Sequence, residues 1–193
     1  MTDKLKRLYE GKGALDRYFE EKIPRDIYRG RKQGAHTDVM QPTILGFYKR
    51  KVDVRPPDIF ISDKMGTSPQ FINGDEGKLV VDDKTGTLTA DIIRDADKYM
   101  VRGCRTMKGN YRGVSLFHKT NPRLRNFDWF KIPKDTEIPK SLACTRDSYL
   151  TEAQINNRTE PAVHYTIAPK DDMPLSLFLQ ELKVLSSKAI KEK

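Results

Sequence analysis

The alternation of hydrophobic and polar residues predicts a helix at each end of the chain and short strands between them. Hydrophobic residues recur at helical spacing in residues 4–22 and again from Pro174 to Ile190, so each segment is predicted to be an amphipathic helix. Glycine and proline punctuate the segments between them, as is typical of strands joined by turns. The pattern therefore predicts an α+β fold without regular βαβ alternation.

The predicted strands are short segments rich in β-branched and aromatic residues. They are "RDIYRGRK", which ends as a strand at Gly30, "GVSLF" (113–117), "FDWFKI" (127–132) and "AVHYTIA" (162–168). The pattern over residues 33–60 predicts a loop with brief strands. The pattern over residues 59–93 predicts strands joined by turns. Residues 142–160 are polar and irregular, with a short helix near 150–157.

The composition favours one domain with a basic surface. The 193 residues suffice for a single core, so residues 1–193 are predicted to form one domain. The formal net charge is +9, and 33% of the residues are charged. This favours an anionic partner, such as nucleic acid, a phosphate-bearing cofactor or an acidic protein, but a solvated basic face is the alternative.

The sequence lacks the patterns of membrane insertion and of signal-dependent secretion. No run of about 18 apolar residues occurs, and the charged N-terminal segment has no apolar signal region. The expected location is the cytoplasm of a producing or target cell, with any export by a route without a cleaved signal. Cys104 and Cys144 suit a reducing compartment, and a disulfide between them is left open.

Residues 83–89 read "DKTGTLT", the phosphorylation signature of P-type ion pumps. Phosphoryl transfer also needs Mg²⁺ held by further carboxylates, a lysine and a hydroxyl group. The later pair Asp171-Asp172 lacks the context of such a site, and no βαβ repeats follow Asp83. The motif is therefore interpreted as a turn between two strands around Gly86. An Asp83-dependent phosphotransferase or phosphatase remains the remote alternative.

Three other segments are similar to a known enzyme pattern: "IYRG" (27–30), "RGVSLF" (112–117) and "HYTIAP" (164–169). An arginine on an early strand, a serine on a middle strand and a polar pair on a late strand resemble ADP-ribosyltransferase folds. The downstream half resembles the NAD-dependent toxin family that type VI secretion systems export. The matching motifs occur in the family's order: Ile132-Pro133, Ile138-Pro139, Asp147-Ser148-Tyr149 and His164 to Pro169.

The resemblance implies an ADP-ribosyltransferase-like mixed fold with a central split β-sheet core and flanking N- and C-terminal helices. It implies an enzyme that uses NAD as a substrate and either transfers ADP-ribose to a target macromolecule or hydrolyses NAD. It also implies delivery by a secretion system and neutralisation by an immunity protein. Residues 61–109, which short members of the family lack, are interpreted as a family-variable β-hairpin insertion. The alternative is a non-catalytic basic module that binds RNA or an acidic protein.

The residues expected to bind NAD lie on two of the predicted strands. Arg29 would bind the diphosphate, because a guanidinium group makes charge-assisted, often bidentate bonds to phosphate. Gly30 would let the backbone approach the nicotinamide amide closely, with a simple turn glycine as the alternative. Tyr28 and Phe117 would stack on the nicotinamide ring, with a place in the core as the alternative for both.

The candidate catalytic residues are Ser115, His164 and Tyr165. Cleavage of the nicotinamide–ribose bond passes through an oxocarbenium-like transition state, which the site must stabilise. Ser115 would hydrogen-bond the ribose or fix a neighbouring catalytic group, and His164 would orient a substrate by a hydrogen bond. Since His164 and Tyr165 are adjacent on one strand, they are expected on opposite faces, with one of them facing the site.

Other titratable residues receive structural or open interpretations. His36 and His118 are interpreted as structural, and no set of His, Cys, Asp and Glu has the spacing of a metal site. Most ADP-ribosyltransferases place a glutamate on a late strand. Glu152 and Glu160 are the available candidates for that residue, and neither lies in a matching motif.

Overall fold

The computed structural model describes residues 18–34, 39–40, 42, 47–49, 93–101, 103–105, 113–148, 150–158 and 162–193. The strands are β1 (Tyr18–Phe19), β2 (Ile27–Lys32), β3 (Phe47–Lys49), β4 (Tyr99–Val101), β5 (Val114–Phe117), β6 (Phe127–Ile132), β7 (Leu142–Arg146), β8 (His164–Pro169), β9 (Met173–Pro174) and β10 (Ile190–Lys191). The helices are the 3₁₀ turn η3 (Ala96–Lys98), α3 (Glu152–Asn156) and α4 (Leu175–Ser186).

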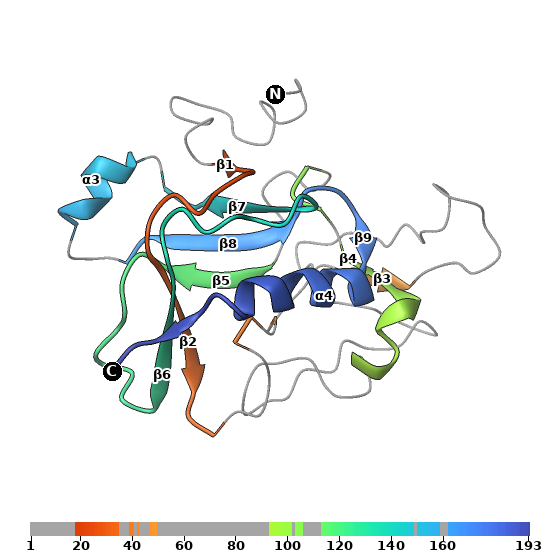
Figure 1. The fold of residues 1–193 in the computed structure, drawn as a ribbon, viewed down its shortest axis with the longest axis horizontal. Helices are drawn as coiled ribbons and strands as arrows, with labels where there is room; N and C mark the ends of the chain where they lie inside the picture. Colours follow the sequence, from red (N-terminus) through yellow and green to blue (C-terminus); the bar gives the residue numbers. More distant parts are fainter. Residues whose placement is uncertain are drawn as a thin grey trace.

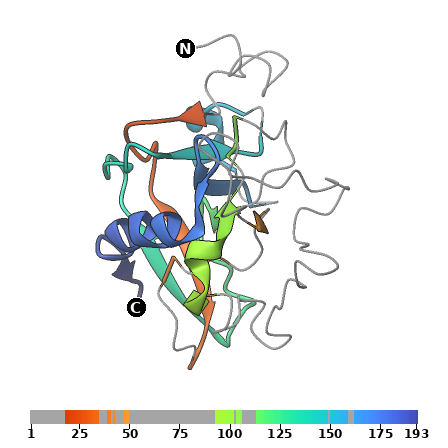
Figure 2. The same cartoon turned by 90° about the vertical axis from the view of Figure 1, so that its right-hand side faces the viewer.

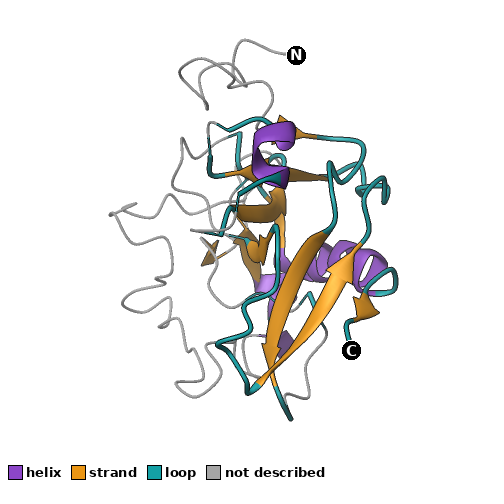
Figure 3. Ribbon diagram, turned by 90° about the vertical axis from the view of Figure 1, so that its left-hand side faces the viewer, coloured by secondary structure: helices purple, strands orange, loops and turns teal. Residues whose placement is uncertain are grey.

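The described strands form two antiparallel sheets. The larger has seven strands in the order β1-β7-β8-β5-β2-β6-β10, and the smaller has three in the order β3-β4-β9. Strand β2 pairs along its length with β6 but meets β5 at a single residue pair, Tyr28 and Phe117. In Figure 1, β5, β7 and β8 run across the view while β2 and β6 run down it, and Figure 3 shows β2 and β6 side by side. The large sheet therefore changes direction between β5 and β2, and the predicted α+β fold is confirmed.

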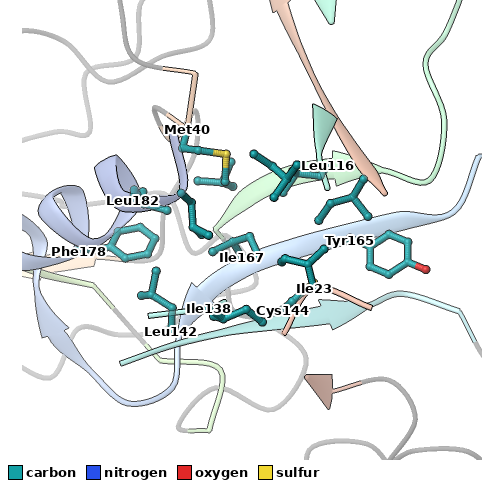
Figure 4. Packing of buried hydrophobic residues seen from close by; sticks show 14 of the residues in the cluster. Ile23, Met40, Leu116, Ile138, Leu142, Cys144, Tyr165, Ile167, Phe178 and Leu182 are labelled. Atoms are coloured by element: carbon teal, nitrogen blue, oxygen red, sulfur yellow. The ribbon is translucent and has the colours of Figure 1, made fainter. Parts of the chain in front are cut away.

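Helix α4 covers one face of the large sheet and closes the hydrophobic core. Its buried residues are Leu175, Phe178, Leu182 and Leu185, whose spacing of three and four residues places them on one side of the helix. Figure 4 shows Phe178 and Leu182 packed beside Ile167 of β8, and Figure 2 shows α4 on one side of the sheet. Complete burial of each such side chain contributes about 2 kcal/mol, so α4 adds a substantial apolar surface to the core.

Most of the strands predicted from the sequence are present. Strands β2, β5, β6 and β8 are found at the predicted segments, with β2 continuing beyond Gly30 to Lys32 and β8 continuing beyond Ala168 to Pro169. The helix predicted near 150–157 is α3, and the C-terminal helix is α4. In the predicted insertion, residues 93–101 and 103–105 are described. Strand β4 lies there and pairs with both β3 and β9.

The prediction of a helix over residues 4–22 is wrong for its C-terminal part, and residues 4–17 lie outside the described residues. Tyr18 and Phe19 form strand β1, which pairs with β7 at the edge of the large sheet. The backbone then bonds to a distant segment, since Ile138 N–H donates to Glu21 O at 2.8 Å. Glu20 is ion-paired with Arg105, with 2.7 Å between Oε1 and Nη2. These long-range partners replace the local bonds of a helix.

Strand β7 was not predicted, because residues 142–160 were interpreted as polar and irregular. All five of its residues, Leu142 to Arg146, are buried. A strand covered on both faces shows no alternation of hydrophobic and polar residues, so the usual sequence signal is missing. Arg146 is buried because it is paired with Glu152 of α3, and this partner is invisible in the sequence.

The two cysteines are thiols in separate buried positions. Cys104 and Cys144 are both free in this structure, so the disulfide left open by the sequence does not form. Burial raises the pKa of Cys104 to about 12, and burial also raises the pKa of Cys144. Both side chains are therefore neutral and poorly nucleophilic at neutral pH.

Replacing Thr151 with alanine is expected to lower the free energy of unfolding by about 1 kcal/mol. Thr151 is the N-cap of α3: its Oγ1 accepts a bond from Gln154 N–H at 3.2 Å, and Gln154 Oε1 accepts one from Thr151 N–H at 2.8 Å. Alanine removes the first bond of this capping box. Urea unfolding of Thr151→Ala and of the control Thr151→Ser measures the effect. Equal losses in both variants would contradict the capping role.

Candidate functional site

A row of aligned side chains crosses one face of the large sheet. His164 of β8 is opposite Phe117 of β5, Phe117 is opposite Tyr28 of β2, and Tyr28 is opposite Lys131 of β6. Residues directly opposite one another on antiparallel strands present their side chains on the same face. We call this set, with Asp147 at its end, the aromatic row. It joins three of the predicted site residues, Tyr28, Phe117 and His164.

Asp147 extends the aromatic row beyond the end of β7. Its backbone N–H donates to His164 O at 3.0 Å, and its Oδ2 lies 2.5 Å from His164 Nδ1. On the other side of the imidazole, the ring of Phe117 lies 5.4 Å from that of His164, centroid to centroid, with an interplanar angle of 52°. In the sequence, Asp147 belongs to a motif of the resembling family but was assigned no role. Its carboxylate comes from a segment 17 residues before His164, and spacing alone does not show that the two side chains meet.

A second row, two residues further along the strands, carries hydroxyl groups. Ser115 is opposite Thr166, Thr166 is opposite Thr145, and Thr145 is opposite Tyr18. Thr145 and Thr166 are buried, whereas Ser115 is half-buried. Side chains two residues apart on a strand share a face, so Ser115 lies on the same face as Phe117. The predicted ribose-binding serine is thus next to the aromatic row.

Gly30 also lies on this face, because it is two residues beyond Tyr28 on β2. It is opposite Trp129, and a β-carbon at Gly30 would lie 2.9 Å from Cη2 of that indole ring. The indole ring therefore occupies the space that a side chain would need. Gly30 is within a strand, so the alternative of a simple turn glycine is not what the structure shows.

Arg29 lies on the opposite face, towards the core. It is buried, with 7% of its surface exposed. Its Nη1 donates to Ser115 O at 2.8 Å and its Nε donates to Val39 O at 3.3 Å. Burial, together with the nearby charge of Arg31, lowers the pKa of Arg29 to about 10. Arg29 thus joins β2 to β5 and to the segment at Val39. Its bond is to the backbone oxygen of Ser115, whose side chain points to the opposite face of the sheet.

Tyr165 is on the core face too, so it and His164 lie on opposite faces of β8, as predicted, and His164 is the one that faces the candidate site. Its ring is fully buried, and its hydroxyl donates to Glu152 at 2.9 Å from Oε1. Glu152 also pairs with buried Arg146 and lies 3.6 Å from Arg25, measured between Oε2 and Nη1. Burial raises the pKa of Tyr165, and the charge of Glu152 raises it further. Glu152, one of the two candidate glutamates, is engaged in this network, and Glu160 lies outside the described residues.

His118 and His164 differ in how their ring nitrogens are used. Nδ1 of His118 accepts a bond from Val163 N–H at 2.8 Å, and Nε2 lies 3.3 Å from Arg158 O. Both nitrogens therefore have backbone partners, and burial lowers the pKa of the ring. This supports the structural interpretation of His118. His36 lies outside the described residues.

Other motifs from the sequence contribute nothing to this face. Asp83 and its motif lie outside the described residues. Within the described ranges, no group of three or more His, Cys, Asp and Glu side chains is arranged to hold a metal ion. Among the helices that the structure describes, none has the length and hydrophobicity needed to cross a membrane.

The chemistry of this face suits a flat heteroaromatic ring joined to a sugar. Tyr28 and Phe117 offer ring surfaces for stacking, Ser115 offers a hydroxyl to a ribose, and His164 offers a proton acceptor or donor. Search of the curated protein sequences found no match to the chain. A family model described as "Tse2 ADP-ribosyltransferase toxin" matches residues 4–193, almost the whole chain. The predicted toxin family and enzyme class are thereby confirmed. The chain belongs to the Tse2 family of ADP-ribosyltransferase toxins, enzymes that transfer ADP-ribose.

Proposed function

We propose that NAD is the ADP-ribose donor and that it binds on the face that carries the aromatic row and Ser115. The observation that carries this proposal is the register, which aligns His164, Phe117 and Tyr28 side by side from three strands. The single residue pair between β2 and β5 lies within this row. A bend in the sheet at this place gives a ligand contacts from strands of two directions.

Each side chain on this face has a task in the cleavage of the nicotinamide–ribose bond. Phe117 and Tyr28 stack on the nicotinamide ring, and Ser115 hydrogen-bonds the ribose. As the bond breaks, positive charge develops on the ribose, and nicotinamide leaves as a neutral molecule. His164 orients the reacting groups by a hydrogen bond. The ring of Trp129 lies against Gly30, so we propose that Gly30 contributes by making room for that ring next to Tyr28, and contact of its backbone with the nicotinamide carboxamide would require the ring to move.

Arg29 is proposed to support binding of the diphosphate indirectly, because it lies on the core face with 7% of its surface exposed and does not share the face proposed for NAD. Its guanidinium bonds to Ser115 O and to Val39 O. Through the bond to Ser115 O, the same side chain would align the serine with the ribose.

Tyr165 is proposed to support catalysis from behind the site. Its hydroxyl and the buried network around Glu152 fix β8, and His164 and Thr166 are its neighbours on that strand. A strand held on its core face presents the opposite face with little freedom, which lowers the entropy cost of aligning a substrate.

The family also supports a biological setting for the enzyme. We propose that residues 1–193 act as a single toxin domain, because the family match spans residues 4–193. The proposed partners are a target macromolecule in the recipient cell and an immunity protein in the producer, with delivery by a type VI secretion system. The net charge of +9 is compatible with an acidic or nucleic-acid target.

Ser115→Ala and Phe117→Ala are each expected to lower NAD cleavage by about 10- to 100-fold while the protein remains folded. The measurements are nicotinamide release from NAD by the purified protein, and growth and cellular NAD in an expressing bacterium. Ser187→Ala, at an exposed serine after α4, is the matched control and keeps wild-type activity.

Two outcomes would overturn the proposal. If the wild type releases no nicotinamide but binds RNA with strong salt dependence, the protein is the basic binding module of the alternative. If Asp83→Ala abolishes toxicity while Ser115→Ala does not, the phosphorylation motif carries the activity instead. The assays on purified protein decide the first outcome. The expression experiment decides the second, with each variant compared at equal protein level.

A further inference from the structure

The pairing of Asp147 with His164 determines which nitrogen of the imidazole ring carries a proton. At neutral pH a carboxylate only accepts hydrogen bonds. The 2.5 Å contact of Asp147 Oδ2 with Nδ1 therefore requires a proton on Nδ1, an assignment made from the partner rather than from a visible hydrogen. In the neutral ring Nε2 then carries the lone pair.

Nε2 of His164 is available to a substrate. No hydrogen bond joins it to any described residue, and 32% of the His164 side chain is exposed. His118 is the internal contrast, because its two nitrogens are both held by backbone groups and its side chain is buried. Of the two described histidines, His164 therefore keeps a proton-accepting nitrogen on the proposed NAD-binding face. Both ring nitrogens of His118 are already hydrogen-bonded.

Apart from Asp147, the described residues that face His164 across the row at close range are uncharged. Phe117 faces it from β5, Thr166 follows it on the same face of β8, and Tyr28 is one strand beyond Phe117. Lys131 is the next member of the row, beyond Tyr28. Among the described residues, Asp147 is the charged group in contact with the imidazole ring.

We propose that Asp147 is a positioning residue that holds His164 as the general base for a hydroxyl acceptor of ADP-ribose. This inference rests on the proposed function. The oxygen of an alcohol or of water forms a bond to the ribose C1 atom while the C–N bond to nicotinamide breaks. The electron pair of that bond leaves with nicotinamide, and the proton of the hydroxyl moves to Nε2 of His164. Asp147 then faces the imidazolium ion and stabilises it.

The acceptor class follows from this chemistry. A hydroxyl group keeps its proton at neutral pH and needs a base to become a good nucleophile, whereas an anion needs none. The inference therefore names an O–H group as the acceptor, in a macromolecule or in water. Both sources share the proton transfer to His164.

The test compares an acceptor that has a proton with one that has none. Nicotinamide release from NAD is measured for the wild type, His164→Ala and Asp147→Asn, with methanol and water as the O–H acceptors and with azide ion as the anionic acceptor. His164→Ala is expected to lose about 100-fold and Asp147→Asn about 10-fold with the O–H acceptors. With azide as the acceptor, both variants are expected to release nicotinamide at a rate within a few-fold of the wild-type rate measured with azide. Product analysis separates methyl ADP-ribose from free ADP-ribose and so distinguishes the alcohol from water.

The split between kcat and KM gives a second readout that a merely structural role would not move. Loss of base catalysis slows the chemical step without removing a contact with NAD, so Asp147→Asn is expected to lower kcat and to leave the KM for NAD within about twofold of the wild type. Asp128→Asn is the control, since Asp128 is also half-exposed and its Oδ2 lies 3.0 Å from a cation, Nζ of Lys191. This control keeps the wild-type kcat and KM.

The results that overturn the inference differ from those that overturn the proposed function. If the wild type releases no nicotinamide under any condition, the proposed function fails. If the wild type is active but both variants keep its rate with methanol and water, only the role of the pair fails. If azide does not restore the variants, or Asp147→Asn raises the KM for NAD without lowering kcat, the two residues act by some route other than base catalysis. Azide rescue also requires folded protein that binds NAD, so misfolding cannot produce the expected result.

Discussion

Glu152→Ala is expected to lower the free energy of unfolding by about 3 kcal/mol, the largest stability effect predicted for a single polar side chain in this protein. The carboxylate of Glu152 pairs with Arg146, of which 1% of the side chain is exposed, and accepts the bond from the buried hydroxyl of Tyr165. Alanine removes the carboxylate that contacts both groups. The buried hydroxyl then loses its acceptor and the buried cation loses this ion pair while keeping Ser148 O and the ring of Phe19 as neighbours, so part of their desolvation is no longer compensated.

Urea unfolding curves of the wild type, Glu152→Ala and Glu152→Gln measure this effect. Glutamine keeps an oxygen for Tyr165 but has no charge for Arg146, so its loss is expected to be smaller than that of alanine. Glu137→Ala is the matched control, because Glu137 is exposed and is expected to change stability by less than about 0.5 kcal/mol. A change in Glu152→Ala no larger than in this control would show that the buried network adds little to stability.

Arg29→Ala is expected to lower ADP-ribosyl transfer by at least about 100-fold and the free energy of unfolding by about 2 kcal/mol. The guanidinium of Arg29 bonds to Ser115 O and to Val39 O, so alanine leaves both partly buried carbonyl groups short of a donor. Ser115 lies on the face proposed for NAD, and its alignment depends on the same bond.

Arg29→Lys separates these contributions. Lysine keeps the positive charge but has no planar fork of donors to serve two carbonyl groups at once. The expected result is a modest loss of stability and about a tenfold rise in KM for NAD. Arg31→Ala is the control, because Arg31 is two residues along the same strand and on the same face, and it is expected to keep KM unchanged. If Arg29→Ala loses stability but keeps kcat and KM in its folded fraction, Arg29 is structural and does not support binding of the diphosphate.

These predictions assign different tasks to the two faces of the same strands. The core face carries the arginine, tyrosine and glutamate side chains that hold the strands together. The other face carries the aromatic row and the hydroxyl groups proposed to contact substrate. His164 and Tyr165 illustrate the division, since they are adjacent in sequence but have no partner in common. Loss of stability is therefore expected from changes on the core face, accompanied by loss of activity at Arg29 because it also holds Ser115. Loss of activity with retained stability is expected from changes on the other face.

The sequence predicted those elements whose signal is local. Strand β8 alternates and is rich in β-branched residues, and α4 repeats its hydrophobic residues at helical spacing. Helix α4 lies within its predicted segment, and β8 extends one residue beyond its own, to Pro169. The capping box of α3 is likewise a local pattern, from Thr151 to Gln154. Local propensity and amphipathic pattern agree with the tertiary structure in these three elements, so the prediction succeeded.

Where prediction failed, the partners are distant in the sequence. The segment at Tyr18 was predicted to be helical from its hydrophobic spacing, but pairing with β7 places it in the sheet. Strand β7 itself is buried on both faces, and its Arg146 is accommodated only because Glu152 lies next to it. From the sequence alone, a charged residue such as Arg146 is predicted to be exposed. Its ion pair with Glu152 of α3 allows it to be buried.

The candidate site divides in the same way. Motif order in the sequence selected Tyr28, Ser115, Phe117 and His164 and indicated the toxin family, because these residues lie within short recognisable segments. Alternation along β8 also separated His164 from Tyr165. The tertiary structure alone decided the strand register, which aligns His164 with Phe117 and Tyr28, turns Arg29 to the core and adds Asp147 to the row. The physical reason is that residue type and spacing determine which face of a strand a side chain occupies, while hydrogen bonding between strands determines which side chains meet.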